Sequence, residues 1–269
     1  MDFGETLLAH EPAIRLGAFL GIFAAVAAWE TLSPRRRRVL PRLLRWTNNF
    51  AIVAVNSLLL RLVFPAAAVG FAWFAAERGL GLFHLLDLPT LLEGLLAFLL
   101  LDLAIWAQHL AFHKVPMFWR LHRMHHADLD FDVTTGARFH PVEILLSMAI
   151  KFAVIVTLGA PPLAVLLFEL VLNATSMFNH ANASLPPAIE RMVRLFVVTP
   201  DMHRVHHSVI RRETDSNFGF NFPWWDRIFG TYRAQPELGH DGMTIGIESF
   251  RDAAEARLDR LLTQPFREA

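Results

Sequence analysis

Long apolar stretches constrain this chain more than any other feature of its sequence. Four of them run from Ile14 to Trp29, from Trp46 to Ala76, from Leu91 to Trp106 and from Ile144 to Thr175. A bilayer core about 30 Å thick is crossed by about 20 apolar residues in a helix, whose backbone hydrogen bonds are all internal. Because 54% of the residues are hydrophobic and only 19% are charged, we predict a membrane protein rather than a soluble enzyme.

Two of the apolar stretches contain helix-breaking residues. Arg61 and Pro65 interrupt the second stretch, so we predict a bend there. The run from Gly159 to Pro162 stands near the centre of the fourth stretch. It predicts a helical hairpin whose arms of roughly 15 residues are about 22 Å long, so that the hairpin dips into the bilayer without fully crossing it. The predicted fold is an all-α membrane bundle of about four embedded helical segments, this hairpin included.

Positively charged residues are unevenly distributed between the loops. Six arginines follow the first apolar stretch, namely Arg35, Arg36, Arg37, Arg38, Arg42 and Arg45, and Lys114, Arg120, Arg123 and Arg138 follow the third. Arg78 alone stands between the second and the third. Since basic loops stay in the cytosol, we predict that both basic segments and everything from His180 onward are cytosolic. We expect a multi-pass protein of the bacterial inner membrane or the endoplasmic reticulum, folded as one membrane domain over residues 1–269 with a cytosolic, histidine-rich helical cap.

The composition excludes several kinds of site. The chain has no cysteine, which rules out disulfides, zinc–thiolate sites, cysteine-ligated iron–sulfur clusters and thiol catalysis. Its 25 basic residues balance 25 acidic ones, so there is no net positive field to hold nucleic acid. Any metal or catalytic chemistry must therefore use nitrogen and oxygen atoms.

The 13 histidines are concentrated in three motifs. His109 and His113 form HxxxH at the end of the third apolar stretch; His122, His125 and His126 form HxxHH, and so do His203, His206 and His207. On a helix these spacings place the imidazoles of one motif on one surface. At this histidine content, one HxxHH arises by chance in about 3% of such chains and two in about one in a thousand. His10, His84 and His240 lie outside the motifs and are expected to be ordinary surface or core residues.

Eight imidazoles gathered at a membrane surface require a cation among them. They could not all stay charged together, whereas neutral imidazole binds iron, zinc, copper and nickel. Eight ligands exceed the needs of one ion, so we predict two metal ions. The chain has no HExxH zinc motif, and the remaining common use of two nitrogen-bound metals beside a membrane is oxygen activation by iron. The alternative is a non-catalytic membrane metal-binding or transport protein, but transport favours ligands spread across the membrane rather than gathered at one face.

The motifs and the residues around them resemble the integral-membrane sterol desaturase and fatty acid hydroxylase superfamily of histidine-rich diiron enzymes. The resemblance rests on WRLHRMHH, TTGARFHPVE, FNHAN, MHRVHH and NFGFNFPWWDRIFGTY, and it covers residues 99–233. It implies a helical membrane core of four-helix type and a cytosolic site with two iron ions. The implied metal ligands are His109, His113, His122, His125, His126, His180, His203, His206 and His207. Many relatives have Arg after the first histidine, where this chain has Leu110; the difference bears on substrate detail more than on the metal site.

Neutral imidazoles leave the charge of two divalent ions uncompensated, so carboxylates are expected near the site. Metal-bound histidines usually donate their second N–H to a carboxylate or a carbonyl. The candidate partners are Asp102, His140, Glu143 and Asp201, together with Asp128 and Asp132. For His140 the alternative is that it is itself a metal ligand, and for Asp128 and Asp132 it is a solvated surface position. Asp102 has the strongest support, because an ionisable group within an apolar stretch usually has a partner. Arg61 and Glu169 are also ionisable residues within apolar stretches, so each of them is likewise expected to have a partner.

The resemblance implies an oxidoreductase that uses O2 as co-substrate to hydroxylate or desaturate a C–H bond of a membrane lipid, such as a sterol or a fatty acyl chain. An alternative with the same metal site is ether-lipid (alkylglycerol-type) monooxygenation. Oxidation of the substrate supplies only two of the four electrons needed to reduce O2 to water. Because the chain has no GxGxxG and no P-loop, we expect a separate electron donor, which is a reductase, a ferredoxin or a cytochrome.

Two further segments carry expectations about the cap. Residues 218–232 concentrate seven aromatic side chains, including the only tyrosine. They predict either an aromatic belt at the level of the lipid headgroups or a wall of the lipid entrance. Residues 248–262 place Phe250, Ala254, Leu258, Leu261 and Leu262 at helical spacing, which predicts a helix that covers the cap.

Overall fold

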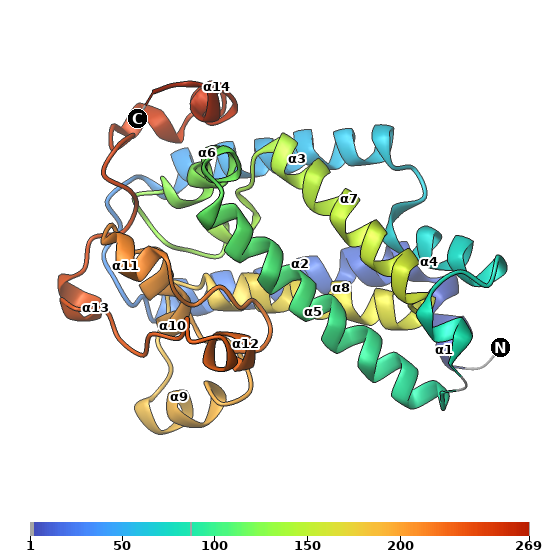
Figure 1. The fold of residues 1–269 in the computed structure, drawn as a ribbon. Coiled ribbons are helices and arrows are strands. Elements are labelled where there is room, and N and C mark those ends of the chain that lie inside the picture. The colour runs from blue at the N-terminus through green and yellow to red at the C-terminus, as the bar shows by residue number, and fades with distance from the viewer. Residues whose placement is uncertain (1–2, 87, 269) are drawn as a thin grey trace.

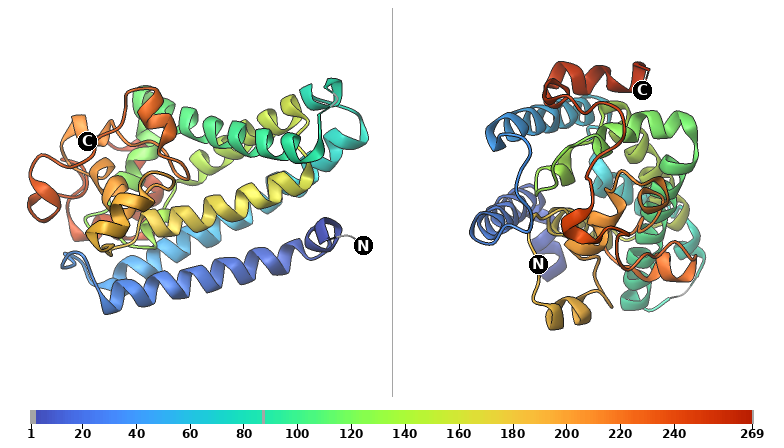
Figure 2. Two further views of the ribbon diagram at one scale, coloured as in Figure 1. Left: turned by 90° about the horizontal axis from the view of Figure 1, so that it is seen from below. Right: turned by 90° about the vertical axis from the view of Figure 1, so that its left-hand side faces the viewer.

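Five long helices form the body of the molecule. The computed structural model describes residues 3–86 and 88–268, and within them the chain is helical apart from loops and two isolated β-bridges. The long helices are α2 (Glu11–Leu32), α3 (Arg42–Val63), α5 (Thr90–Lys114), α7 (Pro141–Leu158) and α8 (Pro162–Asn179). Successive long helices run in opposite directions, as Figures 1 and 2 show. The predicted all-α bundle is confirmed.

The helices α2, α5, α7 and α8 are each long and apolar enough to cross a membrane. α3 forms a further candidate span together with the short α4 (Ala67–Glu77) and η1 (Leu82–Leu85) that follow it. The part of the chain that the structure describes has five such segments, because the two arms of the hairpin, α7 and α8, are separate helices of 18 residues each. At 1.5 Å per residue each arm is about 27 Å long. The arms are therefore longer than the sequence predicted, and close to the thickness of a bilayer core.

The helix breaks fall where the sequence predicts them. α3 ends at Val63 and α4 begins at Ala67, so Pro65 separates two helices. The hairpin turns at Gly159, whose φ of 68° is in the left-handed region that favours glycine. Gly81 approaches this turn so closely that a Cβ there would lie 2.1 Å from the backbone nitrogen of Gly159. The two glycines thus let the η1 segment pack directly against the turn.

Apolar side chains fill the end of the bundle where α4, α7 and α8 meet, which we call the far end. Phe71 of α4 and Phe152 of α7 stack with their ring centroids 3.9 Å apart. Phe168 of α8 is fully buried in the same cluster. The outer faces of the long helices carry exposed leucines, such as Leu58 and Leu95. Helices that are apolar both inside and outside the bundle are typical of membrane spans.

The remaining short helices gather at the opposite end of the bundle and form a cap (Figure 1). They are α6 (Pro116–His126), η2 (Thr135–Ala137), α9 (Pro187–Val193), α10 (Pro200–His206), α11 (Arg211–Thr214), α12 (Trp224–Ile228), α13 (Gly239–Gly242), η3 (Ala253–Ala256), α14 (Leu258–Thr263) and η4 (Gln264–Phe266). The arginine-rich loop after α2 joins the cap, since Arg35 donates a hydrogen bond to Asp241 at 2.6 Å. The short α1 (Phe3–Ala9) lies at the far end. Segments that the sequence assigns to one side of the membrane are thus at one end of the bundle.

The prediction of one continuous helix over residues 248–262 is wrong. The structure divides it into η3 and α14, with Arg257 in an extended conformation between them. Tertiary contacts explain the break, because the backbone N–H of Leu258 donates to Asn48 of α3 at 2.7 Å. Leu261 is fully buried in a cluster with Ile52 of α3. The C-terminal segment is thereby fastened to α3.

Candidate metal centre

Nine histidines converge where the bundle meets the cap. The first group contains His109, His113, His122, His126 and His206, and the second group contains His125, His180, His203 and His207. Within each group, one ring nitrogen per histidine lies within 4.8 Å of every other. None of the nine residues is more than 3% exposed. The eight motif histidines and His180 are thus brought together as two sets of nitrogen ligands.

Each HxxHH motif is divided between the two groups. The i and i+4 histidines of the α6 motif, His122 and His126, belong to the first group, and the i+3 histidine, His125, belongs to the second. The α10 motif is divided the other way, because its i+3 histidine, His206, is the one in the first group. On a helix, positions i and i+4 lie about 40° apart, and i+3 lies on the other side of i. The spacing lets one helix serve two ions.

Hydrogen bonds from Nδ1 set the orientation of five rings. His109 donates to the carbonyl of Phe218 at 2.7 Å, His206 to that of Ser216 at 2.7 Å, His180 to that of Ser176 at 2.8 Å, His125 to that of Arg138 at 3.2 Å, and His122 to Glu143 Oε1 at 2.6 Å. Their Nε2 atoms then approach one another, 3.1 Å apart between His109 and His122. When Nδ1 holds the proton, both Nε2 atoms carry lone pairs, which repel at this distance unless a cation binds them. This arrangement is typical of metal-bound histidines.

Other rings have buried nitrogens without a hydrogen-bond partner. Within the described residues, both ring nitrogens of His126 and of His207 are in this state. An unpaired buried polar atom costs about 1–3 kcal/mol, and a bound ion would remove that cost. Burial and the neighbouring imidazoles hold the pKa of both rings well below the usual value, and burial lowers the pKa of His180 to about 3. These rings are neutral near pH 7, which is the form that binds metal, so the donor set fits two transition-metal ions.

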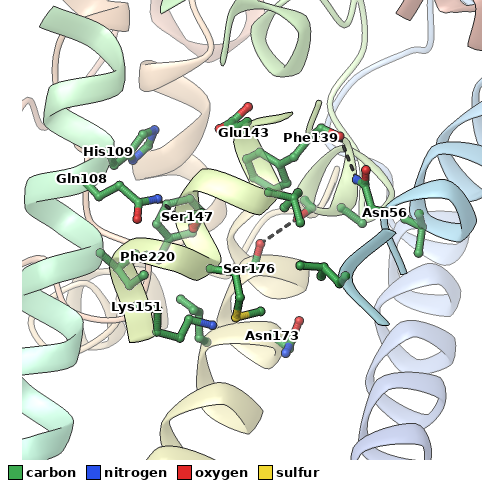
Figure 3. A pocket seen from close by; sticks show the side chains of 18 of the residues that line it. Asn56, Gln108, His109, Phe139, Glu143, Ser147, Lys151, Asn173, Ser176 and Phe220 are labelled. Atoms are coloured by element: carbon green, nitrogen blue, oxygen red, sulfur yellow. Dashed lines mark hydrogen bonds between the residues drawn. The ribbon is translucent and has the colours of Figure 1, made fainter. Parts of the chain in front are cut away.

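A cavity of about 400 Å³ leads from the membrane-embedded part of the bundle to the first histidine group (Figure 3). His109 and His122 form part of its wall, along with side chains from α2, α3, α5, α7 and α8. Most of the lining is apolar, with Phe112 and Met148 as examples. The exposed Ser57 of α3 is also in the wall, so the cavity meets the outer surface of the bundle. The sequence did not predict this cavity, because five helices far apart in the chain enclose it.

The aromatic segment over residues 218–232 has two environments. The Phe220 ring lies 4.9 Å from that of His109 and lines the cavity, and the Phe218 ring lies 5.1 Å from that of His113. Phe229, by contrast, is exposed. The start of the segment is therefore a wall of the site, whereas Phe229 lies on the surface, where an aromatic belt would place it.

Among the polar residues expected beside the metals, Glu143 contacts a histidine of the centre. Its Oε1 accepts the Nδ1–H of His122. Asp102 is buried but accepts a hydrogen bond from Trp225 Nε1 at 2.8 Å instead. Asp215, which the sequence did not single out, lies 3.4 Å from His113 Nδ1. The candidate carboxylates of the first group are therefore Glu143 and Asp215.

Among the described residues, His140 and Asp201 make their polar contacts outside the two histidine groups. The Nδ1 of His140 accepts the backbone N–H of Val142 at the start of α7, and its Nε2 donates to the carbonyl of Leu262 at 3.2 Å. Asp201 forms an ion pair with Arg204 on the same helix. Both contacts hold segments of the cap in place rather than a histidine of the centre.

Asp128 and Asp132 are buried in an ion network and are not solvated surface acids. Arg45 of α3 donates to both oxygens of Asp128 at 2.8 and 2.7 Å and also pairs with Asp132. Although burial raises the pKa of Asp128, the guanidinium groups of Arg45 and Arg138 lower it to about 2. The same loop carries the Arg138 carbonyl that orients His125. From the sequence we identified Arg45 only as one of the basic loop residues. Its contacts with Asp128 and Asp132, which hold the loop beside His125, could not be predicted.

The sequence pattern of the fatty acid hydroxylase family matches residues 94–231, which is just over half of the chain and includes all nine histidines. The chain belongs to the fatty acid hydroxylase family. With its five long apolar helices, it is a multi-pass membrane protein of that family.

Three known proteins illustrate the similarity. An ornithine lipid hydroxylase of Rhizobium tropici is 27% identical over 148 residues, which cover 55% of this chain and 44% of the relative. Alkylglycerol monooxygenase of Homo sapiens is 31% identical over 157 residues, 57% of this chain and 34% of the relative. Cholesterol 25-hydroxylase of Rattus norvegicus is 31% identical over 173 residues, 63% and 56% respectively. The chain thus spans about a third to somewhat over half of the length of these relatives. No solved structure matches the chain.

Proposed function

We propose that this protein is an O2-dependent oxidoreductase that hydroxylates or desaturates a C–H bond of a membrane lipid at a pair of iron ions. The observation that carries the proposal is the convergence of nine buried histidines at one end of a largely apolar cavity between membrane-embedded helices. By their names, the three relatives act on an ornithine lipid, an alkylglycerol and cholesterol. All three substrates are lipids, which supports a lipid substrate here.

The histidines are proposed to hold the two ions, five at one position and four at the other. Nitrogen ligands suit several metals, and iron is chosen because the relatives are named hydroxylases and monooxygenases. Bound iron would supply the activation of O2 that such chemistry needs. The chain's own residues orient the rings through their Nδ1 hydrogen bonds. Phe139, stacked on His125 with centroids 4.5 Å apart, and Phe220, whose ring lies 4.9 Å from that of His109, cover these two imidazoles with apolar surface.

Two alternatives use the same site. Ether-lipid monooxygenation, which begins with hydroxylation beside the ether oxygen, is favoured by the similarity to alkylglycerol monooxygenase. A metal-binding or transport protein without catalysis is less well supported, because the histidines form one cluster at one end of the bundle. Transport requires ligands at successive depths.

The histidine centre is proposed to face the cytosol, in the bacterial inner membrane or the endoplasmic reticulum. The proposal rests on the arginine-rich loop after α2, which contains Arg35, Arg36, Arg37 and Arg38. This loop lies at the cap end, because Arg35 and Arg36 donate hydrogen bonds to Asp241 and to the carbonyl of Met243. Tags placed after Pro34 and at the C-terminus are expected to be accessible from the cytosol, and a tag near Gly79 from the other side. A C-terminal tag found on the non-cytosolic side would contradict the proposed orientation.

The electrons are proposed to come from a separate protein, which is a reductase, a ferredoxin or a cytochrome. Hydroxylation of R–H by O2 gives R–OH and water, and it consumes two electrons and two protons besides those of the substrate. The sequence has no cysteine for an iron–sulfur cluster and no dinucleotide-binding motif. These absences from the sequence support a donor outside this chain.

The test of the function compares lipids from cells that express the chain with lipids from cells that express a His125→Ala variant. Mass spectrometry is expected to find a lipid that has gained one oxygen atom, or lost two hydrogens, only with the unaltered chain. Metal analysis of the purified protein is expected to give close to two iron ions per chain. Active protein with a single zinc ion would contradict the diiron assignment.

A further inference from the structure

Six large apolar side chains of the cap are exposed, and we call them the apolar rim. Each of them is between 47% and 68% exposed. They belong to two segments, residues 189–196, which include the end of α9 and the turn that follows it, and residues 228–229 at the end of α12. An exposed apolar patch of this kind marks a surface that contacts a partner or a membrane. The rim consists of Ile189, Met192, Leu195, Phe196, Ile228 and Phe229.

Hydrogen bonds join the two segments of the rim into one surface. Trp224 Nε1 of α12 donates to the carbonyl of Leu195 at 2.8 Å. The guanidinium of Arg227 donates to the carbonyl of Arg194 at 2.7 Å. These two bonds hold α12 against the turn after α9, and Figure 1 shows the two helices as neighbours at one edge of the cap. The rim side chains of both segments therefore lie on the same part of the cap.

The α12 segment lies beside α5 and not beyond its end. Phe229 stacks on Trp106 of α5 with ring centroids 4.6 Å apart. Upstream of α12, the Phe222 ring lies 5.9 Å from the ring of Phe98, which is still deeper along α5. Trp106 is itself about 12 Å along the helix from Lys114, the last residue of α5. This part of the cap thus extends along α5 toward the far end.

The length of α5 places Trp106 within the bilayer core. α5 has 25 residues and is about 37 Å long, whereas the core is about 30 Å thick. Even if all of the excess projects on the cap side, the core extends about 20 residues from Thr90, which is beyond Trp106. Phe229, which stacks on Trp106, therefore lies at the depth of the lipid chains with more than half of its surface exposed.

The loop that precedes α12 is irregular, and a bilayer core tolerates irregular backbone only where the protein satisfies its peptide groups. This loop meets the condition. The backbone N–H groups of Phe218 and Gly219 donate to the two carboxylate oxygens of Asp226 at 2.9 and 2.8 Å. Asn179 of α8 donates to the carbonyl of Phe220 at 3.0 Å. The polar groups of the loop thus face the protein, and apolar side chains of the rim are left on the outside.

Two exposed arginines flank the rim. Arg191 stands beside Met192, and Arg227 stands beside Ile228. Neither arginine forms an ion pair with a carboxylate of the residues that the structure describes, and Arg227 instead packs over the ring of Tyr232, 4.9 Å from its centroid. Arginine side chains extend from apolar surface to the phosphate groups of lipids. Uncompensated positive charge beside exposed apolar groups fits the headgroup layer of a bilayer better than a second apolar protein surface.

We propose that the apolar rim is an in-plane membrane anchor, whose partner is the phospholipid leaflet on the cap side. Its apolar side chains lie among the lipid chains, and Arg191 and Arg227 lie at the phosphates. α9 has seven residues and α12 has five, so neither crosses the bilayer, and both lie at its surface. The anchor holds the histidine centre at a fixed depth, because the loop before α12 carries the Phe218 carbonyl that orients His109.

The test uses the absence of cysteine from the sequence, because a single introduced cysteine can carry a nitroxide label at a chosen site. Met192→Cys and Phe229→Cys place the label on the two segments of the rim. Leu58→Cys on the outer face of α3 is the control for lipid, and Leu238→Cys beside α13 at the tip of the cap is the control for water; both leucines are as exposed as the rim residues. Each purified full chain is reconstituted in vesicles of phosphatidylcholine and phosphatidylglycerol.

Spin-label saturation then measures the access of two reagents, O2, which dissolves in lipid, and a water-soluble nickel chelate. We expect the labels at Met192 and Phe229 to match the label at Leu58, with high access to O2 and low access to nickel, and the label at Leu238 to show the reverse. Nickel access at both rim positions equal to that at Leu238 would overturn the proposal. Rim labels shielded from both reagents would show that protein, such as a second copy of this chain, covers the rim, which would also overturn it. If one rim variant fails to fold, the other decides, because the two stand on different segments.

A second measurement tests the arginines. The double variant Arg191→Gln with Arg227→Gln removes both charges, and native mass spectrometry counts the phosphatidylglycerol and phosphatidylcholine that each chain retains. Because each arginine at a membrane surface favours anionic lipid about fivefold, the double variant is expected to lose most of its preference for phosphatidylglycerol. Arg212→Gln is the control, since Arg212 is equally exposed but pairs with Glu237 outside the rim. An unchanged preference in the double variant would overturn the placement of the arginines at the phosphates. Neither measurement depends on bound metal or on lipid oxidation.

Discussion

The two ends of the bundle share the long helices but are held together by different interactions. α5 shows the contrast along its own length: Ala97 and Leu101 are buried in the apolar core, whereas His109 and His113 are buried in the histidine centre. At the far end, aromatic rings stack on one another. At the cap end, even Arg45 is fully buried. Apolar packing dominates one end, and buried polar groups dominate the other.

The contrast shows which end depends on something outside the chain. Apolar packing at the far end is complete once the helices meet. The cap end buries imidazole nitrogens that have no partner within the described chain and charges that are costly unless all of them are paired. We therefore expect changes of metal and pH to affect the cap end more than the far end, where the buried Glu169 is already paired with Lys151 and Arg15.

Loss of a single histidine from either group is expected to have the largest effect. His125→Ala removes a ligand from the second group and His206→Ala from the first, so each should abolish lipid oxidation and lower the iron content by about one ion per chain. The double variant should lose both ions and be no less active than either single variant, because residues that act as one unit are not additive. Metal analysis and lipid mass spectrometry measure both effects.

The control for the histidine variants is His10→Ala. His10 is exposed and hydrogen-bonds to the backbone of its own helical segment, so oxidation is expected to stay within a few-fold. All variants should remain in the membrane, since the apolar helices drive insertion. Two metals retained in both His125→Ala and His206→Ala would contradict the assignment of the two groups.

The next largest effect is expected from Arg45→Leu. This change leaves Asp128 and Asp132 buried without their main partner, and breaking a buried ion network in this way costs about 3–5 kcal/mol. Thermal unfolding should begin at a lower temperature, and hydrogen exchange should rise in residues 127–140 but not in α4. Arg45→Lys keeps the charge but loses the bidentate contact with Asp128. Its unfolding temperature is expected to lie between those of the unaltered chain and of Arg45→Leu. Unchanged exchange in the loop would contradict this role of Arg45.

The stability of the metal-free protein is expected to fall as the pH falls below about 6.5. Burial lowers the pKa of His180 from 6.5 to about 3, so below 6.5 the unfolded chain binds a proton that the folded chain does not. At pH 5 this difference destabilises the folded state by about 2 kcal/mol for His180 alone. Unfolding of chelator-treated protein at pH 7.5 and pH 5 measures the loss, and bound metal should reduce it. An unfolding temperature independent of pH would contradict the prediction.

The smallest effect is expected from Phe152→Leu at the far end. Loss of the stacked ring is expected to cost about 1 kcal/mol, as for other conservative core changes, because Phe71 and the neighbouring helices can repack. Iron content and lipid oxidation should stay at the level of the unaltered chain. Loss of iron from this variant would show that the two ends are coupled and would contradict their independence.

The sequence was sufficient to predict the long helices and the nine histidines that the structure groups together. The apolar stretches and the breaks at Pro65 and Gly159 are properties of neighbouring residues, so they could be read directly. The helix over residues 248–262 failed for the opposite reason. Its break at Arg257 depends on the contact between Leu258 and Asn48 of α3, about two hundred residues away in the chain. His140, similarly, was expected near the metals and instead bonds to the C-terminal segment.

The sequence by itself determined an all-helical membrane fold and a cluster of histidines, because hydrophobic length and the spacing of HxxHH act within one helix. Only the tertiary structure decided how each motif is divided between two groups and where the cavity lies. It also decided that Arg45 is a buried partner of Asp128 rather than a solvated loop residue. These features depend on which faces of distant helices meet. Burial makes a charge or an unpaired polar atom costly, and this burial exists only after the helices have packed together.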